Sequence, residues 1–273
     1  MLRLQGSDGW WLVTHPDHAH LAGEFAEAWG NELFATPEPR EHVLRGVHAH
    51  DNGWASRDAK PVVMRSGKPA AFSVELVGSY SAFEEIDLEA YLAVRRSAVQ
   101  LIAKEDAYAA ILISMHTYNL LTDRADRSTI RPEQLPMLDE FLAEQLKLQG
   151  DLREKLLEEG SISQEWLTAA AFVENFRLLQ ACDNLSLLSC VDFGGDATLL
   201  WPQRLRDGEA REIAVSRVGA RSFKLTPYPF AEREMVFKLR ARFVPGLVFA
   251  SDEDLQAGFD AAAVEEVEVR VSA

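Results

Sequence analysis

The chain has 273 residues, 47% of them hydrophobic and 26% charged, and its formal net charge is −15. This length and composition are typical of a globular protein with one large or two small domains around a hydrophobic core. An acidic surface repels phosphate backbones and no basic run is present, so nucleic acid is excluded as a partner.

Two features of the sequence predict a cytoplasmic protein without a membrane partner. No apolar run approaches the roughly 20 residues of a membrane span, and the first residues lack the long apolar segment of a signal peptide. Cys182 and Cys190 fall in one predicted helix, about 12 Å apart along its axis. A disulfide allows at most about 7 Å between Cα atoms, so we expect both cysteines to be reduced core residues.

From the first residue to about residue 191 the predicted elements are mostly helices. Short apolar runs at 2–5 and 10–14 flank a Gly-Ser-Asp-Gly turn and predict a β-hairpin. The helical periodicity of apolar residues then predicts helices near 17–30 and 39–50 and, after a loop-like stretch over 55–82, near 86–104, 106–121, 132–159 and 162–191. The short connections between the first three of these later helices are typical of a helical bundle.

Beyond Asp192 the sequence changes from helical periodicity to alternation. Alternating apolar residues predict strands at 213–218, 222–226, 234–243 and 264–271, with a short helix over 251–262. The predicted fold class is mainly α: a helical bundle with an N-terminal β-hairpin and a small C-terminal antiparallel β-sheet (α+β overall). We expect a helical domain over 1–192 and a β-rich appendage over 193–273 that packs on it. The appendage could also form the edge of a homodimer.

Five residues with ionisable side chains lie on the apolar stripes of the predicted helices. Each is spaced three or four residues from Leu, Ile, Val or Phe on the same helical face, so each should point inward. They are His18, His50, Asp51, His116 and Asp183. Taken singly, an inward histidine is more often a hydrogen-bonded core residue than a ligand. Asp51 alone is compatible with a helix-terminal turn, and Asp183 alone with an ion pair to Arg177.

The five residues considered together favour a metal site. A buried ionised carboxylate must be paired or bound to a metal, and few Lys or Arg residues lie on these inward stripes. Neutral imidazoles with carboxylates are ligands of Mn, Fe, Zn or Ni rather than of calcium. We therefore expect His18, His50, Asp51 and Asp183 to hold a divalent transition metal.

The order of these residues resembles the HD-domain superfamily of metal-dependent phosphohydrolases. A histidine, a His-Asp pair and a distant aspartate match His18, His50-Asp51 and Asp183, and the resemblance implies a helical core with one divalent metal. His116 lies where two-metal members carry additional histidines, which implies one or two ions. Many hydrolytic members have a lysine soon after the His-Asp pair, whereas this chain continues with Asn52, Gly53 and Trp54.

A closer resemblance is to an uncharacterised bacterial family, a domain of unknown function, over residues 10–245. It is carried by DHAHLAGEFAEAWGN (17–31), PEPREHVLRGVHAHDNGWASRD (37–58), LISMHTYNL (112–120) and NFRLLQACDNLSLLSC (175–190). This family has no established function, so the match implies a fold and a site but no substrate.

Together the resemblances imply a metal-dependent phosphohydrolase that acts on a small phosphorylated metabolite or nucleotide. His116 would serve as a second-metal ligand, a general acid or a phosphate contact, and Asp58 would assist catalysis by orienting a ligand histidine. Two alternatives remain open, an HD-like di-iron oxygenase and a non-catalytic protein that binds a metal or another ligand.

Overall fold

The computed structural model describes residues 1–71, 87–191 and 193–273. Its strands are β1 (Leu2–Gln5), β2 (Gly9–Val13), β3 (Asp196–Thr198), β4 (Gln203–Arg204), β5 (Ala210–Arg211), β6 (Ala214–Gly219), β7 (Ser222–Thr226), β8 (Glu234–Pro245) and β9 (Val264–Ser272). Its α-helices are α1 (His15–Ala28), α2 (Arg40–Ala49), α3 (Ala55–Asp58), α4 (Leu88–Ala103), α5 (Ala107–Thr122), α6 (Leu135–Glu159), α7 (Ala169–Cys190) and α8 (Asp252–Ala261), and a 3-10 turn, η1, spans Asn52–Trp54.

These boundaries confirm most of the predicted helices and strands to within a few residues. The helix predicted from residue 162 begins only at Ala169, after a 3-10 turn. The stretch predicted as a loop starts with α3, and its residues 72–82 lie outside the described residues. In the part of the chain that the structure describes, no helix combines the length and apolarity needed to cross a membrane.

The β-structure is much larger than the sequence predicts. Seven of the described strands form one sheet in the order β1-β2-β8-β9-β7-β6-β3. The N-terminal hairpin belongs to it because β2 pairs antiparallel with β8, where Trp10 lies opposite Val244. The pair β7 and β9 is parallel, whereas β8 and β9 are antiparallel. The prediction of a mainly α fold with a small antiparallel C-terminal sheet is therefore wrong.

The physical reason for this error lies in strand pairing. Alternation with a period of two identifies a strand and its buried face, but it does not identify the neighbouring strand. The alternating pattern therefore does not reveal that residues 9–12 pair with 242–245 across most of the chain.

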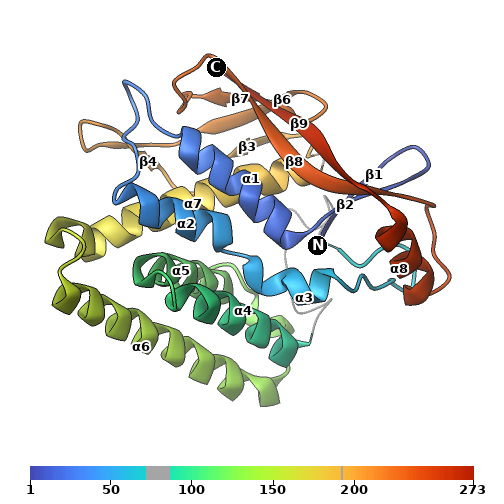
Figure 1. The fold of residues 1–273 in the computed structure, drawn as a ribbon, viewed down its shortest axis with the longest axis horizontal. Coiled ribbons are helices and arrows are strands. Elements are labelled where there is room, and N and C mark those ends of the chain that lie inside the picture. The colour runs from blue at the N-terminus through green and yellow to red at the C-terminus, as the bar shows by residue number, and fades with distance from the viewer. Residues whose placement is uncertain (72–86, 192) are drawn as a thin grey trace.

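Helices α1, α2 and α4 to α7 lie on one side of this sheet and extend away from it, whereas α8 packs against Val244 of β8 in a separate cluster with Trp10 and Leu12. Figure 1 shows α1 against the sheet, α2 and α7 in the middle, and α4, α5 and α6 on the far side. The ring of Phe25 on α1 packs edge-on against Phe237 of β8 at 4.6 Å between centroids. One hydrophobic cluster includes buried residues both before and after residue 192. The division into two domains at 192–193 stays a prediction.

Candidate metal centre

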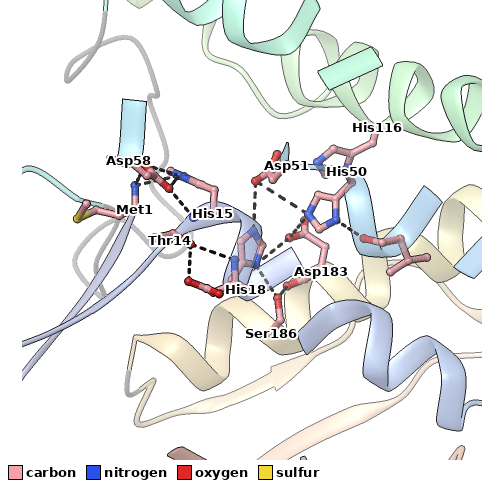
Figure 2. Close-up of polar contacts among 12 residues, drawn as sticks. Met1, Thr14, His15, His18, His50, Asp51, Asp58, His116, Asp183 and Ser186 are labelled. Carbon is pink, nitrogen blue, oxygen red and sulfur yellow. Dashed lines mark hydrogen bonds and ion pairs between the residues drawn. The ribbon is translucent and has the colours of Figure 1, made fainter. Parts of the chain in front are cut away.

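The structure brings together the five residues that the stripes place inward. His18 lies in the first turn of α1, His50 and Asp51 follow the end of α2, His116 lies on α5 and Asp183 on α7. None is more than 7% exposed. Figure 2 shows the histidines and carboxylates turned toward one another between these helices. Among the described residues, two groups could hold an ion, His18 with His50 and Asp51, and His50 with His116 and Asp183.

The His-Asp pair owes its position to the way α2 ends. His50 caps the helix in a helical conformation, Asp51 leaves it, and η1 follows. At Gly53 in η1, an added Cβ would lie 2.3 Å from the carbonyl oxygen of Val94. Only glycine permits this close approach. The absence of a side chain at residue 53 therefore lets α4 pack directly against the turn that carries the pair.

The candidate ligand atoms lie close together. His18 Nε2 is 3.1 Å from Asp51 Oδ2, and His50 Nε2 is 3.4 Å from Asp183 Oδ1. His50 Nε2 is also 4.0 Å from Asp51 Oδ2, and the His18 ring is 3.9 Å from Asp183 Oδ1 through its Nδ1. Asp51 therefore lies near the Nε2 atoms of both histidines, whereas Asp183 lies near Nε2 of His50 and Nδ1 of His18.

Hydrogen bonds outside the cluster orient the rings of His18 and His50. His50 Nδ1 lies 2.8 Å from the carbonyl oxygen of Val47, which can only accept, so Nδ1 carries the hydrogen. Ser186 Oγ donates its hydrogen to the carbonyl oxygen of Asp183 and accepts from His18 Nδ1 at 2.7 Å. In its neutral form His50 then turns the Nε2 lone pair toward the carboxylates, whereas His18 Nε2 lies within hydrogen-bond distance of Asp51 Oδ2.

The Nε2 atom of His50 is buried and has no hydrogen-bond partner. Its neighbours in the cluster are carboxylate oxygens of Asp183 and Asp51. A buried nitrogen that faces two carboxylates is stabilised by a positive charge, which is either a proton on the ring or an ion between the groups. This atom is the clearest sign that the arrangement serves to bind a positive charge.

Arg95 is a member of the site that the sequence analysis missed. Its guanidinium donates to Asp51 Oδ1, its Nε donates to the Tyr91 hydroxyl at 3.1 Å, and it lies over the Trp54 ring at 5.5 Å. The expectation that few cationic side chains lie on the inward stripes is wrong at this position. The sequence does place Arg95 on an apolar stripe, because it shares one helical face with Leu88 and other buried residues of α4.

The charges of the site shift the pKa values of its members. Burial alone would lower the pKa of His50, but the carboxylates of Asp51 and Asp183 outweigh burial and raise it. Burial alone would raise the pKa of Asp51, but Arg95 and His50 hold it well below its usual value. Burial alone would also raise the pKa of Asp183, but the neighbouring histidines lower it. The site therefore keeps both carboxylates ionised.

His116 differs from the other two histidines. Its ring centroid lies 5.1 Å from that of His50, at an angle of 73°. Burial lowers the pKa of His116 to about 3, so the imidazole is neutral at physiological pH.

Asp58 lies in a separate group. Its carboxylate accepts from the backbone N–H of His15 at 2.5 Å and contacts the His15 ring at 2.9 Å and the Met1 amine at 2.7 Å. His15 in turn stacks on Trp54 at 4.4 Å. Among the described contacts, none joins Asp58 to His18, His50 or Asp183. Its predicted catalytic role stays a prediction.

Comparison with known proteins identifies the family of the chain. A family model described as "Protein of unknown function (DUF3891)" matches residues 1–246. No curated protein and no solved structure matches the chain. The resemblance to the HD-domain superfamily stays a prediction. The match covers most of the 273 residues, including every candidate ligand, and the chain therefore belongs to the DUF3891 family.

Proposed function

We propose that His18, His50, Asp51 and Asp183 bind one divalent transition metal and that the chain is a metal-dependent hydrolase of a small phosphorylated compound. The observation that supports the metal most directly is His50 Nε2, a buried atom without a hydrogen-bond partner that faces two carboxylates. The ligand set of imidazoles and carboxylates suits Mn, Fe, Zn or Ni.

The separations between the donors fit this proposal. Ligand atoms about 2.1 Å from one ion lie roughly 3.0 to 3.4 Å from one another in octahedral or tetrahedral geometry. The distances of 3.1 Å from His18 to Asp51 and 3.4 Å from His50 to Asp183 fall in this range. The separation of 4.0 Å between His50 Nε2 and Asp51 Oδ2 requires only a small side-chain shift. The contact of 3.9 Å between His18 and Asp183 is made by Nδ1, which donates to Ser186, so His18 would bind the ion through Nε2.

The contacts favour one ion over two. The two possible groups share His50, and a neutral imidazole offers only one lone pair at Nε2. The Oδ1 atom of Asp51 accepts from Arg95, and the positive charge of this guanidinium disfavours a second cation at the same oxygen. These contacts weigh against a di-iron oxygenase and in favour of a mononuclear hydrolase.

The proposal of hydrolysis rests on ligand order and on the chemistry of the donors. Bound here, a divalent ion would polarise a phosphoryl oxygen and lower the pKa of a neighbouring water molecule. Arg95 would hold Asp51 in place, and Ser186 would hold His18, as expected for residues that orient ligands. The order His, His-Asp, Asp supports a relationship to the HD-domain phosphohydrolases.

A second candidate is a structural metal without catalysis. All four proposed ligands are at least nine-tenths buried, as in closed structural sites, whereas a catalytic ion needs a position open to substrate. In that case the ion would stabilise the contacts among α1, α2 and α7 and the chain would show no hydrolase activity.

Elemental analysis of the purified protein is the experiment that tests the site. Wild type should contain about one transition metal per chain, and His50→Ala and Asp183→Ala should lose it. His48→Ala is the matched control, because His48 lies on the same helix but bonds Glu27 at the surface. A wild type that stays metal-free after incubation with Mn²⁺, Fe²⁺, Zn²⁺ and Ni²⁺ would refute the proposal.

If the metal is present, a screen of small phosphoesters separates the two candidates. Turnover that is lost in Asp183→Ala and kept in His48→Ala supports a hydrolase. A bound metal without turnover of any phosphoester, together with a large loss of thermal stability on chelation, supports a structural ion.

We also propose that the protein acts in the cytoplasm. Cys182 and Cys190 are both buried free thiols, and burial raises the pKa of each. Unreactive reduced cysteines are typical of core residues in reducing compartments.

A further inference from the structure

A chain of two hydrogen bonds joins the protein surface to His116. Gln180 lies on α7, three residues before Asp183, and is 1% exposed. Its Oε1 accepts from the indole Nε1 of Trp201 at 2.9 Å, and its Nε2 lies 3.1 Å from His116 Nδ1. Trp201, which follows β3, is 38% exposed.

These contacts determine which nitrogen of His116 carries a hydrogen. An indole N–H can only donate, so the atom of Gln180 that meets Trp201 must be the carbonyl oxygen. The amide –NH₂ of Gln180 therefore faces His116 and donates to Nδ1. Since Nδ1 accepts, the hydrogen of the neutral imidazole lies on Nε2.

The role of Nδ1 in His116 is thus the reverse of its role in His18 and His50. In those two rings Nδ1 donates to Ser186 or to a backbone carbonyl, and the Nε2 of His50 has no hydrogen-bond partner. In His116 the Nδ1 lone pair is taken by Gln180 and Nε2 bears a hydrogen. Neither nitrogen of His116 is available to an ion, although the ring lies within the second ligand group.

Several contacts hold the segment that carries Trp201 in the position from which the indole reaches Gln180. Trp201 has φ of 64°, a left-handed conformation that is uncommon for a residue with a large side chain. The buried amide of Gln203 donates to the carbonyl oxygens of Trp201 and Leu200 at 3.0 and 3.2 Å. The guanidinium of Arg177 lies over the indole at 5.8 Å.

We propose that Trp201 and Gln180 are positioning residues that hold His116 in the Nε2–H tautomer, so that His116 donates a hydrogen bond at the metal site and is not a ligand. This inference rests on the proposed function, because the donor would stabilise negative charge on the phosphoryl group of the substrate. A neutral imidazole that donates without losing its proton is an established way to polarise an oxygen.

Long-range ¹H–¹⁵N correlation spectra of histidine side chains report the tautomer directly and do not require a metal. The His116 signals are assigned by their absence in His116→Ala. We expect an unprotonated Nδ1 and a protonated Nε2 in wild type, and a protonated Nδ1 in Gln180→Glu, because a carboxylate can only accept from the ring. Gln145→Glu is the matched control: Gln145 is equally buried, but its Oε1 accepts from Ser114. A wild-type His116 with a protonated Nδ1 would overturn the inference.

Titration with Zn²⁺ in a calorimeter tests the second half of the proposal. His116→Ala should leave the dissociation constant for Zn²⁺ within about threefold of wild type, whereas His50→Ala should raise it more than about 100-fold. Equal losses in the two variants would overturn the inference, since His116 would then be a ligand. A wild type that binds no metal would instead refute the proposed function, and the spectra would still decide the tautomer.

Discussion

The ion pair between Arg95 and Asp51 allows a quantitative test of how the site is built. Both side chains are buried, and the guanidinium donates to Asp51 Oδ1. In Arg95→Met a side chain of similar length remains, but the buried carboxylate of Asp51 loses its cation. Removing one partner of a buried ion pair costs about 3–5 kcal/mol, because an uncompensated charge stays behind.

Arg96→Met is the matched control, one residue further along α4. Arg96 pairs with Glu144 at 2.8 Å on the surface, where both side chains are at least 40% exposed. An exposed pair contributes about 0.2–1 kcal/mol. The two substitutions are chemically identical, so the difference between them reports how much more the buried contacts of Arg95 contribute than an exposed pair.

The assay is equilibrium unfolding in urea with a chelator present, so that no ion compensates Asp51. Arg95→Met should lower the free energy of unfolding by about 3–5 kcal/mol and Arg96→Met by less than about 1 kcal/mol. Adding Asp51→Asn to Arg95→Met should recover part of the loss, because the buried charge is then gone. Equal effects of the two arginine substitutions would refute the reasoning.

Three further predictions concern packing, pH and metal removal. Gly53→Ala should lose about 1–3 kcal/mol of stability in thermal unfolding, because its Cβ would meet the Val94 carbonyl, whereas Gly150→Ala in the open middle of α6 should gain up to about 1 kcal/mol. Ion-pairing holds the pKa of Asp58 below its usual value despite burial, so its contribution to stability is present above about pH 4 and lost as pH falls below it. Asp58→Asn should flatten the acid side of the stability profile, and an unchanged profile would contradict this. Chelation should lower the free energy of unfolding of metal-saturated wild type by about 2.7 kcal/mol if the metal had been supplied at 100 times its dissociation constant, and Asp183→Asn should show little change.

The inward positions of the candidate ligands could be predicted from the sequence because burial is a local property of a helix. Spacing by three or four residues places a side chain on the apolar face whatever the helix packs against. His18, His50 and Asp183 are all buried, as their stripes predict. The same reasoning missed Arg95, because a long arginine side chain commonly extends from an apolar face to reach water.

Local periodicity does not give the partners of these side chains. Nothing near Gln180 in the sequence indicates that its amide joins Trp201 to His116. Likewise, β2 and β8 each look like half-buried strands, but their pairing depends on how the helices between them pack. The fold class was wrong for this reason, although most of the individual elements were correctly predicted.

The balance of charge is the reason to propose an ion at this site. Asp51 and Asp183 are buried anions and Arg95 is a buried cation, so one negative charge remains to be compensated. The raised pKa of His50 shows that a proton can do so. A charge-assisted N–H···O bond is usually about 2.7–2.9 Å long, however, whereas His50 Nε2 lies 3.4 Å from Asp183 and makes no hydrogen bond. A proton on His50 would leave this gap unbridged. An ion with bonds of about 2.1 Å to each atom would span it, and its second positive charge would balance a phosphate-bearing substrate.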